Sequence, residues 1–492
     1  MADLTFDQLQ TRLVPLWKSI ERMNQDEQTI VVAPSLTVDA GDLKGAKLQA
    51  YEERFLFLLL LLRQPRARLV HVTSNPILPS IVDYYLDLLP GVIPSHARKR
   101  LFLLAPLDGS PRPLSEKILE RPRLIRQLRD LVIDPERAHL VPYNTTELER
   151  DLAVALGIPM YGADPKHFHF GTKSGCRQLF QEEGVPHPSG REGLRSVPDA
   201  VEAIADMRRE KPELEQVILK LNEGVSGEGN ARVDLRGATT PAEIEERIRG
   251  MRFETNTTYD RYVEKLGQRG GVVEELIAGE EFRSPSVQLR VTPLGKVELL
   301  STHDQVLGGP SGQTYVGCRF PADPGYAAQI TAEAAKVGAR LASEGVIGRF
   351  ALDFVTVRRD GAWQPYAIEV NLRKGGTTHP FLTLQFLTDG VYDPKTAIFT
   401  APSGREKHFV ASDHVERPSY RGLTPDDLFD IVARRGLHFD DARQIGVVFH
   451  MMAALSEEGW VGMTAVGDSP EEADEKYEHA IAALDEEAAS GR

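Results

Sequence analysis

The sequence of 492 residues predicts a chain that is α/β in its first part and α+β in the remainder. Two observations predict this fold class. Up to about residue 158, short apolar runs alternate with helix-like runs, which is typical of a parallel sheet covered by helices. From residue 161 onward, strand-like runs follow one another through glycine-rich turns, which indicates hairpins. At roughly 100–200 residues per domain, we expect about three domains.

The first domain, predicted at 1–160, is expected to contain four strands and four helices. The strands are expected at 29–33, 67–73, 100–105 and 139–143, and the helices at 47–63, 81–89, 123–132 and 146–156. Thr146, followed three residues later by Glu149, predicts a capping box at the start of the last helix. This alternation makes the domain Rossmann-like. It has no Gly-x-Gly-x-x-Gly loop, so a dinucleotide is not the expected ligand.

The second domain, predicted at 161–400, is expected to be α+β. Its expected elements are a helix at 173–183, a hairpin around the loop 222–230, strands across 271–320, a helix at 325–344 and a hairpin with strands at 350–357 and 364–371. Residues 401–422 are polar and rich in turn formers, so we expect a linker there. Residues 423–492 are expected to form a small C-terminal α+β domain.

Composition and charge exclude several classes of protein. Hydrophobic residues make up 41% of the chain and charged residues 26%, as in soluble globular proteins. The net charge of −14 argues against broad nucleic-acid binding, because phosphate backbones attract basic surfaces. Two cysteines, Cys176 and Cys318, are too few for a disulfide framework. With no apolar signal segment and no membrane-length apolar run, a cytoplasmic location is expected.

The glycine-rich loop at 222–230 follows a strand that ends in Lys220. Glycines at 224, 227 and 229 let the backbone approach an anion closely and point N–H groups at it. A lysine that closes an apolar strand is partly desolvated and favours an anion. The alternative is a flexible surface hairpin in which the lysine stem is buried and its ammonium is exposed.

Two carboxylates, Glu274 and Glu275, interrupt an apolar strand that ends at Ile277, and Glu281 follows the turn at Gly279. Such a strand could line an apolar slot for a flat base, and Glu281 could accept bonds from ribose hydroxyls. The alternative is an edge strand with solvated acidic side chains.

Asp353, Glu369 and Asn371 carry the most specific signal. Glu369 and Asn371 are two apart on a strand and so face the same side. If residues 360–362 form a three-residue loop, Asp353 lies directly opposite Glu369, and the two carboxylates share a face. Like charges that close repel unless a cation holds them, and all-oxygen ligands suit Mg²⁺. The alternative is a hairpin with polar residues on its solvated face.

Basic residues follow the hairpin directly. Arg373 could hold a substrate carboxylate or stabilise a tetrahedral oxyanion, and Lys374 beside it is a second candidate for a catalytic residue. The alternative is a charged surface loop.

In sequence order, Lys173 opens a helix, Lys220 precedes a glycine loop, Glu-Glu-x-x-x-Gly-x-Glu follows, and the Asp353 hairpin comes last. This order resembles the ATP-grasp superfamily, and in particular the pheganomycin-type peptide ligase family. The tracts that carry the resemblance are 171–175, 220–230, 301–305 and 369–380. The family has a Rossmann-like pre-ATP-grasp domain, an ATP-grasp core of two α+β subdomains and a small C-terminal domain, so the resemblance covers almost the whole chain.

The resemblance implies ATP and Mg²⁺ as cofactors and assigns residues to them. The implied nucleotide-binding residues are Lys173, Lys220, Gly224, Ser226, Gly227, Gly229, Glu274, Glu275, Ile277 and Glu281, and the implied metal ligands are Asp353, Glu369 and Asn371. Lys173 and Lys220 would contact the α- and β-phosphates. Because the sequence does not fix the strand register, it stays open which of Glu274 and Glu275 faces adenine. Many superfamily members carry an arginine just before the metal-binding aspartate. Here Arg349 stands four residues before it, so Arg373 is the better candidate for an oxyanion or carboxylate contact.

The acceptor site is predicted less sharply. Its candidate residues are Arg283, His303, Asp304, Arg319 and His379, each with a structural role as the alternative. The implied activity is an ATP-dependent carboxylate–amine ligase that acts through an acyl phosphate on a small carboxylate and an amine or peptide. Two alternatives remain open. The same core could serve a phosphotransferase or carboxylate–thiol ligase, or a nucleotide-binding scaffold without catalysis.

Overall fold

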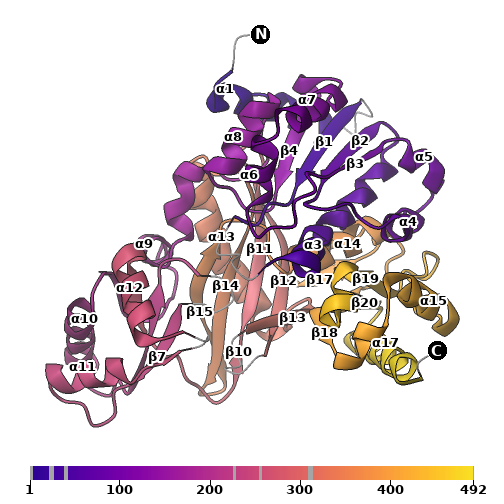
Figure 1. Ribbon diagram of the computed structural model, residues 1–492. Helices are drawn as coiled ribbons and strands as arrows, with labels where there is room; N and C mark the ends of the chain where they lie inside the picture. Colours follow the sequence, from indigo (N-terminus) through magenta and orange to yellow (C-terminus); the bar gives the residue numbers. More distant parts are fainter. Residues whose placement is uncertain are drawn as a thin grey trace.

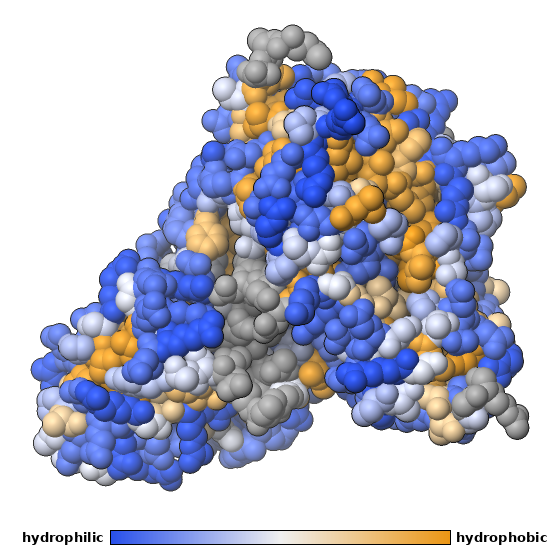
Figure 2. All heavy atoms as spheres, viewed as in Figure 1, coloured by the Kyte–Doolittle hydropathy of each residue, from blue (hydrophilic) through white to orange (hydrophobic). Residues whose placement is uncertain are grey.

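The computed structural model describes residues 4–21, 27–37, 43–224, 229–253, 257–308 and 314–490. It contains three larger sheets, which form an N-terminal unit, a five-stranded unit and a nine-stranded unit (Figure 1). Figure 2 shows a mostly polar face, with apolar residues gathered over the N-terminal unit. Among the described residues, no helix combines the length and apolarity needed to cross a membrane.

The N-terminal unit is a four-stranded parallel sheet of order β3-β2-β1-β4. Its strands are β1 (Gln28–Ala33), β2 (Ala67–Val72), β3 (Leu101–Leu104) and β4 (Ala138–Pro142). Its helices are α1 (Phe6–Gln10), α2 (Leu13–Glu21), α3 (Gly45–Glu53), η1 (Arg54–Arg63), α4 (Pro79–Asp87), α5 (Pro94–Arg98), α6 (Leu114–Leu119), α7 (Pro122–Leu131), η2 (Pro135–Arg137) and α8 (Glu147–Leu156). All four predicted strands are confirmed, and the capping box of Thr146 and Glu149 starts α8 as predicted.

Alternate residues of β1 explain why both faces of this sheet are covered. Ile30 and Val32 belong to one hydrophobic core, together with the apolar residues of η1. Val31 and Ala33 belong to a second core, together with residues of α6 and α8. Successive side chains of a strand point to opposite faces, so an uninterrupted apolar strand needs apolar partners on both sides.

The five-stranded unit is antiparallel, with the order β5-β9-β6-β7-β8. Its strands are β5 (Gly190–Leu194), β6 (Gln216–Leu221), β7 (Asn230–Asp234), β8 (Arg252–Phe253) and β9 (Gly271–Glu275). The helices of this part of the chain are η3 (Pro165–Gly171), α9 (Lys173–Glu182), α10 (Val197–Glu210), α11 (Pro241–Arg249) and α12 (Tyr259–Arg269). It has its own hydrophobic core, which β6 and β7 share with α10, α11 and α12.

The nine-stranded sheet forms the centre of the molecule (Figure 1). Its strands are β10 (Phe282–Arg283), β11 (Pro285–Val291), β12 (Val297–Gly308), β13 (Thr314–Phe320), β14 (Gly348–Arg359), β15 (Ala362–Asn371), β18 (His408–Glu416), β19 (Gly446–His450) and β20 (Trp460–Gly467). The other elements of this part are α13 (Pro324–Ser343), α14 (Thr378–Thr388), β16 (Val391–Asp393), β17 (Ile398–Thr400), η4 (Pro418–Gly422), α15 (Pro425–Arg435), η5 (Met452–Ala454), α16 (Leu455–Glu458) and α17 (Pro470–Ser490). Helix α13 packs on β11 and β12, and α17 packs on β18 and β20.

The prediction of a linker at 401–422 is wrong for its central part. Residues 408–416 form β18, which pairs with β13 on one side and β20 on the other. The C-terminal strands therefore extend the nine-stranded sheet instead of forming a separate one. The polar residues that suggested a linker, Ser412 and Asp413, are buried with tertiary partners. The other domain boundaries stay predictions.

The β14–β15 hairpin has the predicted pairing but reaches it differently. Its turn holds two residues, Asp360 and Gly361, rather than three, and both have positive φ, as a type I′ turn requires. A β-bulge then inserts Ile368 into β15. The extra residue shifts the pairing of the two strands by one position, as a three-residue turn would have done. Asp353 therefore lies opposite Glu369 as predicted.

Candidate active site

A cavity of about 850 Å³ is lined by residues of all three units, and its volume is in the range of small-molecule sites. Its lining includes Tyr51, Arg54 and Tyr143 from the N-terminal unit, Lys220 and Glu274 from the five-stranded unit, and Gln305, Asp353, Glu369, Asn371 and Arg373 from the nine-stranded unit. The three predicted metal ligands and several of the predicted nucleotide contacts therefore meet at one place.

The three predicted metal ligands lie together in this cavity. Asp353 on β14 and Glu369 on β15 are directly opposed, so their side chains share a face. The side-chain amide of Asn371 donates to Asp353 Oδ2 at 2.7 Å. From β12, on the far side of β11 in the sheet, Gln305 Nε2 donates to Asp353 Oδ1 at 2.8 Å. Their role as magnesium ligands stays a prediction.

The charges of this group suit a divalent cation. Burial, reinforced by the Glu369 carboxylate, raises the pKa of Asp353 to about 6. The Glu369 carboxylate therefore destabilises the ionised form of Asp353, and a cation between the two would relieve this repulsion. The oxygen-only donor set of two carboxylates and an amide is the one Mg²⁺ prefers.

Lys173 begins α9 and is buried beside the metal-ligand candidates. Its Nζ atom lies 2.6 Å from Glu369 Oε1. Burial alone would lower the pKa of Lys173, but Glu369 outweighs this effect and raises it. Lys173 is therefore a charged ammonium next to the predicted metal site.

Lys220 on β6 is held by a buried ion pair. Its ammonium donates to Glu274 Oε2 on β9, and Arg177 Nη1 donates to Glu274 Oε1 at 2.9 Å. Burial would raise the pKa of Glu274, but Lys220 and Arg177 outweigh it and lower it. Glu274 thus positions the lysine.

Glu275 also lines the cavity, but its side chain lies on the opposite face of β9 from that of Glu274, as successive strand residues do. Its carboxylate pairs with Lys211 and accepts from the Ser189 amide at 3.0 Å. Each of the two glutamates therefore forms an ion pair with a lysine. Leu276 and Ile277, which follow, line the cavity and offer apolar surface.

The glycine-rich loop lies between β6 and β7, as predicted for a hairpin. Gly224 lines the cavity, and Gly229 adopts a positive φ of 82° close to Leu221, where a side chain would be strained. Ser226 and Gly227 lie outside the described residues, so the predicted role of this loop stays a prediction.

The side chains of the two basic residues that follow the hairpin point in different directions. Arg373 lines the cavity, and its Nη1 donates to the carbonyl of Lys374 at 3.0 Å while its guanidinium lies over the Tyr143 ring. Lys374 points away from the cavity, and its Nζ donates to the Pro142 carbonyl at 2.7 Å. Lys374 is therefore an anchor to β4, and the structure does not place it where a catalytic group would stand.

Arg349 also lies outside the cavity lining. It pairs with Arg290 across β14 and β11 and is buried near Tyr161. Burial, reinforced by the Arg290 charge, lowers the pKa of Arg349 to about 10. Arg373 is thus the one of the three predicted catalytic residues that reaches the cavity.

The anchor role of Lys374 predicts a pH effect on stability. Burial lowers the pKa of Lys374 from 10.5 to about 7, so between pH 7 and 10 the unfolded chain binds more protons than the folded chain. The free energy of unfolding contributed by this group therefore rises with pH across that window. Compared with Lys374→Met, the wild type should gain up to about 1.4 kcal/mol per pH unit there. Urea unfolding at pH 7.5 and 9.5 measures this, and a constant difference between the two proteins would contradict it.

Four of the five acceptor-site candidates lie away from the cavity and have partners elsewhere. His303 is buried among aromatic rings and bonds Gln288 and Ser301, and Asp304 accepts from Tyr326 Oη at 2.6 Å. The other two are paired at the surface: Arg319 with Asp474, and Arg283 with Glu281. None of the four lines the cavity, and neither does Glu281, the predicted ribose contact. The fifth, His379, is buried near Asp413.

Sequence reasoning missed Arg54, Tyr143, Arg177 and Asp413. Arg54 Nη2 and Asp413 Oδ2 lie 2.8 Å apart although 359 residues separate them in the chain. Both line the cavity. No local pattern marks such residues, because the docking of the N-terminal unit onto the nine-stranded sheet creates the pair.

Comparison with known proteins supports one family. The family "IQCH-like, ATP-grasp" matches residues 166–254 and 238–394, and the family "PGM1 C-terminal domain" matches residues 427–490. The L-propargylglycine–L-glutamate ligase of Streptantibioticus cattleyicolor is 30% identical over 439 residues, which cover 88% of each chain.

Two solved structures share the fold. The biotin carboxylase of Campylobacter jejuni, in a β,γ-ATP complex, matches with a TM-score of 0.57 at 13% identity, covering 93% of this chain and 91% of that chain. The biotin carboxylase domain of the Hydrogenobacter thermophilus 2-oxoglutarate carboxylase, crystallised with MgADP, matches with a TM-score of 0.55 at 13% identity, covering 92% and 89%. The chain therefore belongs to the ATP-grasp superfamily and, within it, to the pheganomycin-type ligase family.

Proposed function

We propose that this protein is an ATP-dependent ligase that joins a small carboxylate to an amine through an acyl phosphate and releases ADP and phosphate. The observation that carries the proposal is the convergence of Asp353, Glu369 and Lys220 at one cavity, with Lys173 paired to Glu369 beside it. The relative's printed name, L-propargylglycine–L-glutamate ligase, supports amino acids as the substrate class.

The nucleotide would occupy the side of the cavity formed by the five-stranded unit. Leu276 and Ile277 would cover the base, and Lys220, held in place by Glu274, would bind phosphate oxygens. Lys173 would bind a second phosphate position beside Glu369. When bound by Asp353, Glu369 and Asn371, Mg²⁺ would neutralise charge on the transferring phosphoryl group.

The remaining residues perform positioning and charge stabilisation. A substrate carboxylate oxygen attacks the γ-phosphorus, and ADP leaves. The amine then attacks the carbonyl carbon, and phosphate leaves with the oxygen that the carboxylate contributed. Arg373, which lines the cavity with the metal-ligand candidates, would orient the carboxylate and stabilise the tetrahedral oxyanion.

One incubation tests this proposal. The protein is mixed with Mg-ATP and pools of amino acids and dipeptides, and phosphate, ADP, AMP and new masses are measured. We expect phosphate and ADP in equal amounts together with a product whose mass is the sum of two pool members minus water. Phosphorylated or thioester products would identify the phosphotransferase or thiol-ligase alternative. No ATP turnover with any pool would leave a scaffold without catalysis.

A matched variant excludes contaminating ATPases from that result. Asp353→Asn keeps the shape of the side chain and removes one charge from the predicted metal site, so we expect its turnover to fall to background. If Asp353→Asn and the wild type release phosphate equally, the activity does not belong to this site.

A further inference from the structure

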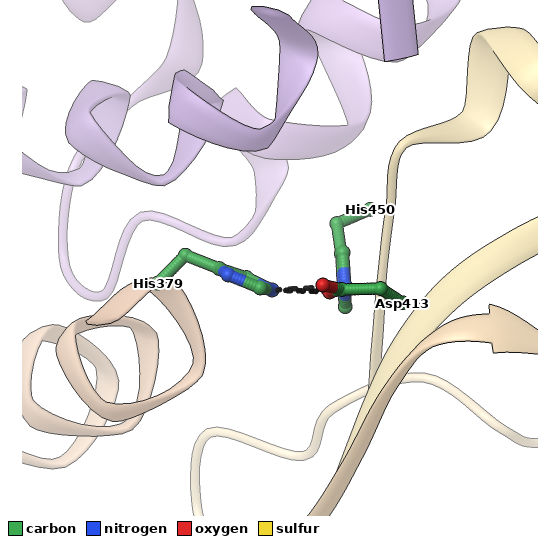
Figure 3. A group of neighbouring side chains, drawn as sticks. All are labelled: His379, Asp413 and His450. Atoms are coloured by element: carbon green, nitrogen blue, oxygen red, sulfur yellow. Dashed lines mark hydrogen bonds and ion pairs between the residues drawn. The ribbon is translucent and has the colours of Figure 1, made fainter. Parts of the chain in front are cut away.

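A second group of metal-ligating side chains lies apart from the magnesium-ligand candidates. His379 on α14, Asp413 on β18 and His450 on β19 point toward one another (Figure 3). Each is at most 4% exposed. They come from three elements that the chain brings together only by folding, so their convergence is a property of the tertiary structure.

The distances within this triad fit a single small ion. His379 Nε2 lies 2.9 Å from His450 Nε2, and Asp413 Oδ1 lies 3.5 Å and 3.3 Å from these two atoms. A tetrahedral ion with bonds of about 2.0–2.1 Å places its ligand atoms roughly 3.3 Å apart. The three distances between these atoms are therefore close to the edge lengths of one face of such a tetrahedron.

The three ligand atoms face one another across a small volume. His379 Nε2, His450 Nε2 and Asp413 Oδ1 each contact the other two. Imidazole nitrogens and carboxylate oxygens are the donors that bind zinc in proteins. A cation at the centre would be bound by all three atoms.

A further contact orients one of the ligand atoms. Arg54 Nη2 donates to Asp413 Oδ2 at 2.8 Å, which turns Oδ1 toward the histidines. Metal-binding carboxylates typically have such an outer partner.

We propose that His379, Asp413 and His450 bind one divalent transition-metal ion, with the ligand set and spacing favouring Zn²⁺. Asp413 also lines the active-site cavity, so the ion would lie next to that cavity. The ion would join α14, β18 and β19 and, through Arg54, the N-terminal unit. This site does not depend on the proposed ligase activity.

Metal analysis of the full-length protein tests the proposal. The protein is produced without a polyhistidine tag, reconstituted with ZnCl₂, dialysed against a weak chelator and analysed by elemental mass spectrometry. We expect about one zinc per chain for the wild type and a loss of at least 90% in Asp413→Asn and in His450→Gln. Two control variants should keep their zinc. One is His408→Gln, which changes a histidine on β18 outside the triad, and the other is Asp353→Asn, which changes the predicted magnesium site.

A spectroscopic measurement covers the case in which the triad variants fail to fold. Wild-type protein loaded with Co²⁺ should show the intense visible absorption of a four-coordinate site, and X-ray absorption at the zinc edge should show two imidazole ligands. Less than about 0.1 zinc per chain after reconstitution would overturn the proposal and leave a hydrogen-bonded triad that shares a proton. Equal zinc in the wild type and in both triad variants would overturn it as well.

Discussion

Replacing Glu369 with glutamine is expected to lower ATP turnover by about 10³-fold, equivalent to roughly 4 kcal/mol of transition-state stabilisation. The substitution removes one negative charge from the predicted magnesium site. It keeps an oxygen that can accept from Lys173, whose Nζ lies 2.6 Å from Glu369 Oε1. The fold should therefore persist while the metal-dependent step fails, and steady-state ADP release with circular dichroism as a fold check measures both.

A carboxylate elsewhere on the chain provides the control for this prediction. Glu298 on β12 is paired with Lys296 at 3.2 Å and lies outside the cavity lining. Glu298→Gln removes the same charge from the same sheet, and we expect turnover within about threefold of the wild type. Near-normal turnover of Glu369→Gln would remove Glu369 from the metal site.

Replacing Lys220 with alanine is expected to weaken ATP binding by roughly 1.5–3 kcal/mol, the contribution of a hydrogen bond to a charged group. That corresponds to an increase of about 10- to 150-fold in Kd. Lys220 lines the cavity, and the buried carboxylate of Glu274 fixes its ammonium there. Isothermal titration with a non-hydrolysable ATP analogue and Mg²⁺ measures the effect.

Lys211→Ala is the matched control, because Lys211 pairs with Glu275 on the opposite face of the same strand. Both variants break a lysine–glutamate pair on β9, but only one changes the predicted phosphate site. We expect the Kd of Lys211→Ala to stay within about twofold of the wild type. Equal affinities for Lys220→Ala and the wild type would contradict the phosphate role.

Local patterns in the sequence predicted much of the fold. The strands of the N-terminal sheet are short, mostly apolar runs, and their burial on both faces makes them recognisable without tertiary information. The β14–β15 hairpin was recognisable from Asp360-Gly361 between two apolar strands. The bulge at Ile368 was not, because no residue type there requires it.

The predictions failed for polar residues that the fold buries against distant parts of the chain. Residues 408–416 suggested a linker because polar residues interrupt the run, yet Asp413 is buried against Arg54 from the other end of the chain. Lys374 suggested catalysis because it follows the metal-ligand candidates, but its side chain bonds the Pro142 carbonyl. In both cases the decisive partner lies more than 200 residues away in the chain, beyond the reach of any local pattern.

The measurement that tests the central claim most directly follows the oxygen of the substrate carboxylate. Once the incubation with amino-acid pools has identified the carboxylate substrate, that acid is labelled with ¹⁸O and the phosphate released with ADP is examined by ³¹P NMR. Activation as an acyl phosphate predicts one ¹⁸O atom transferred to each phosphate formed with product. Unlabelled phosphate, or release of AMP and pyrophosphate in place of ADP, would contradict the account.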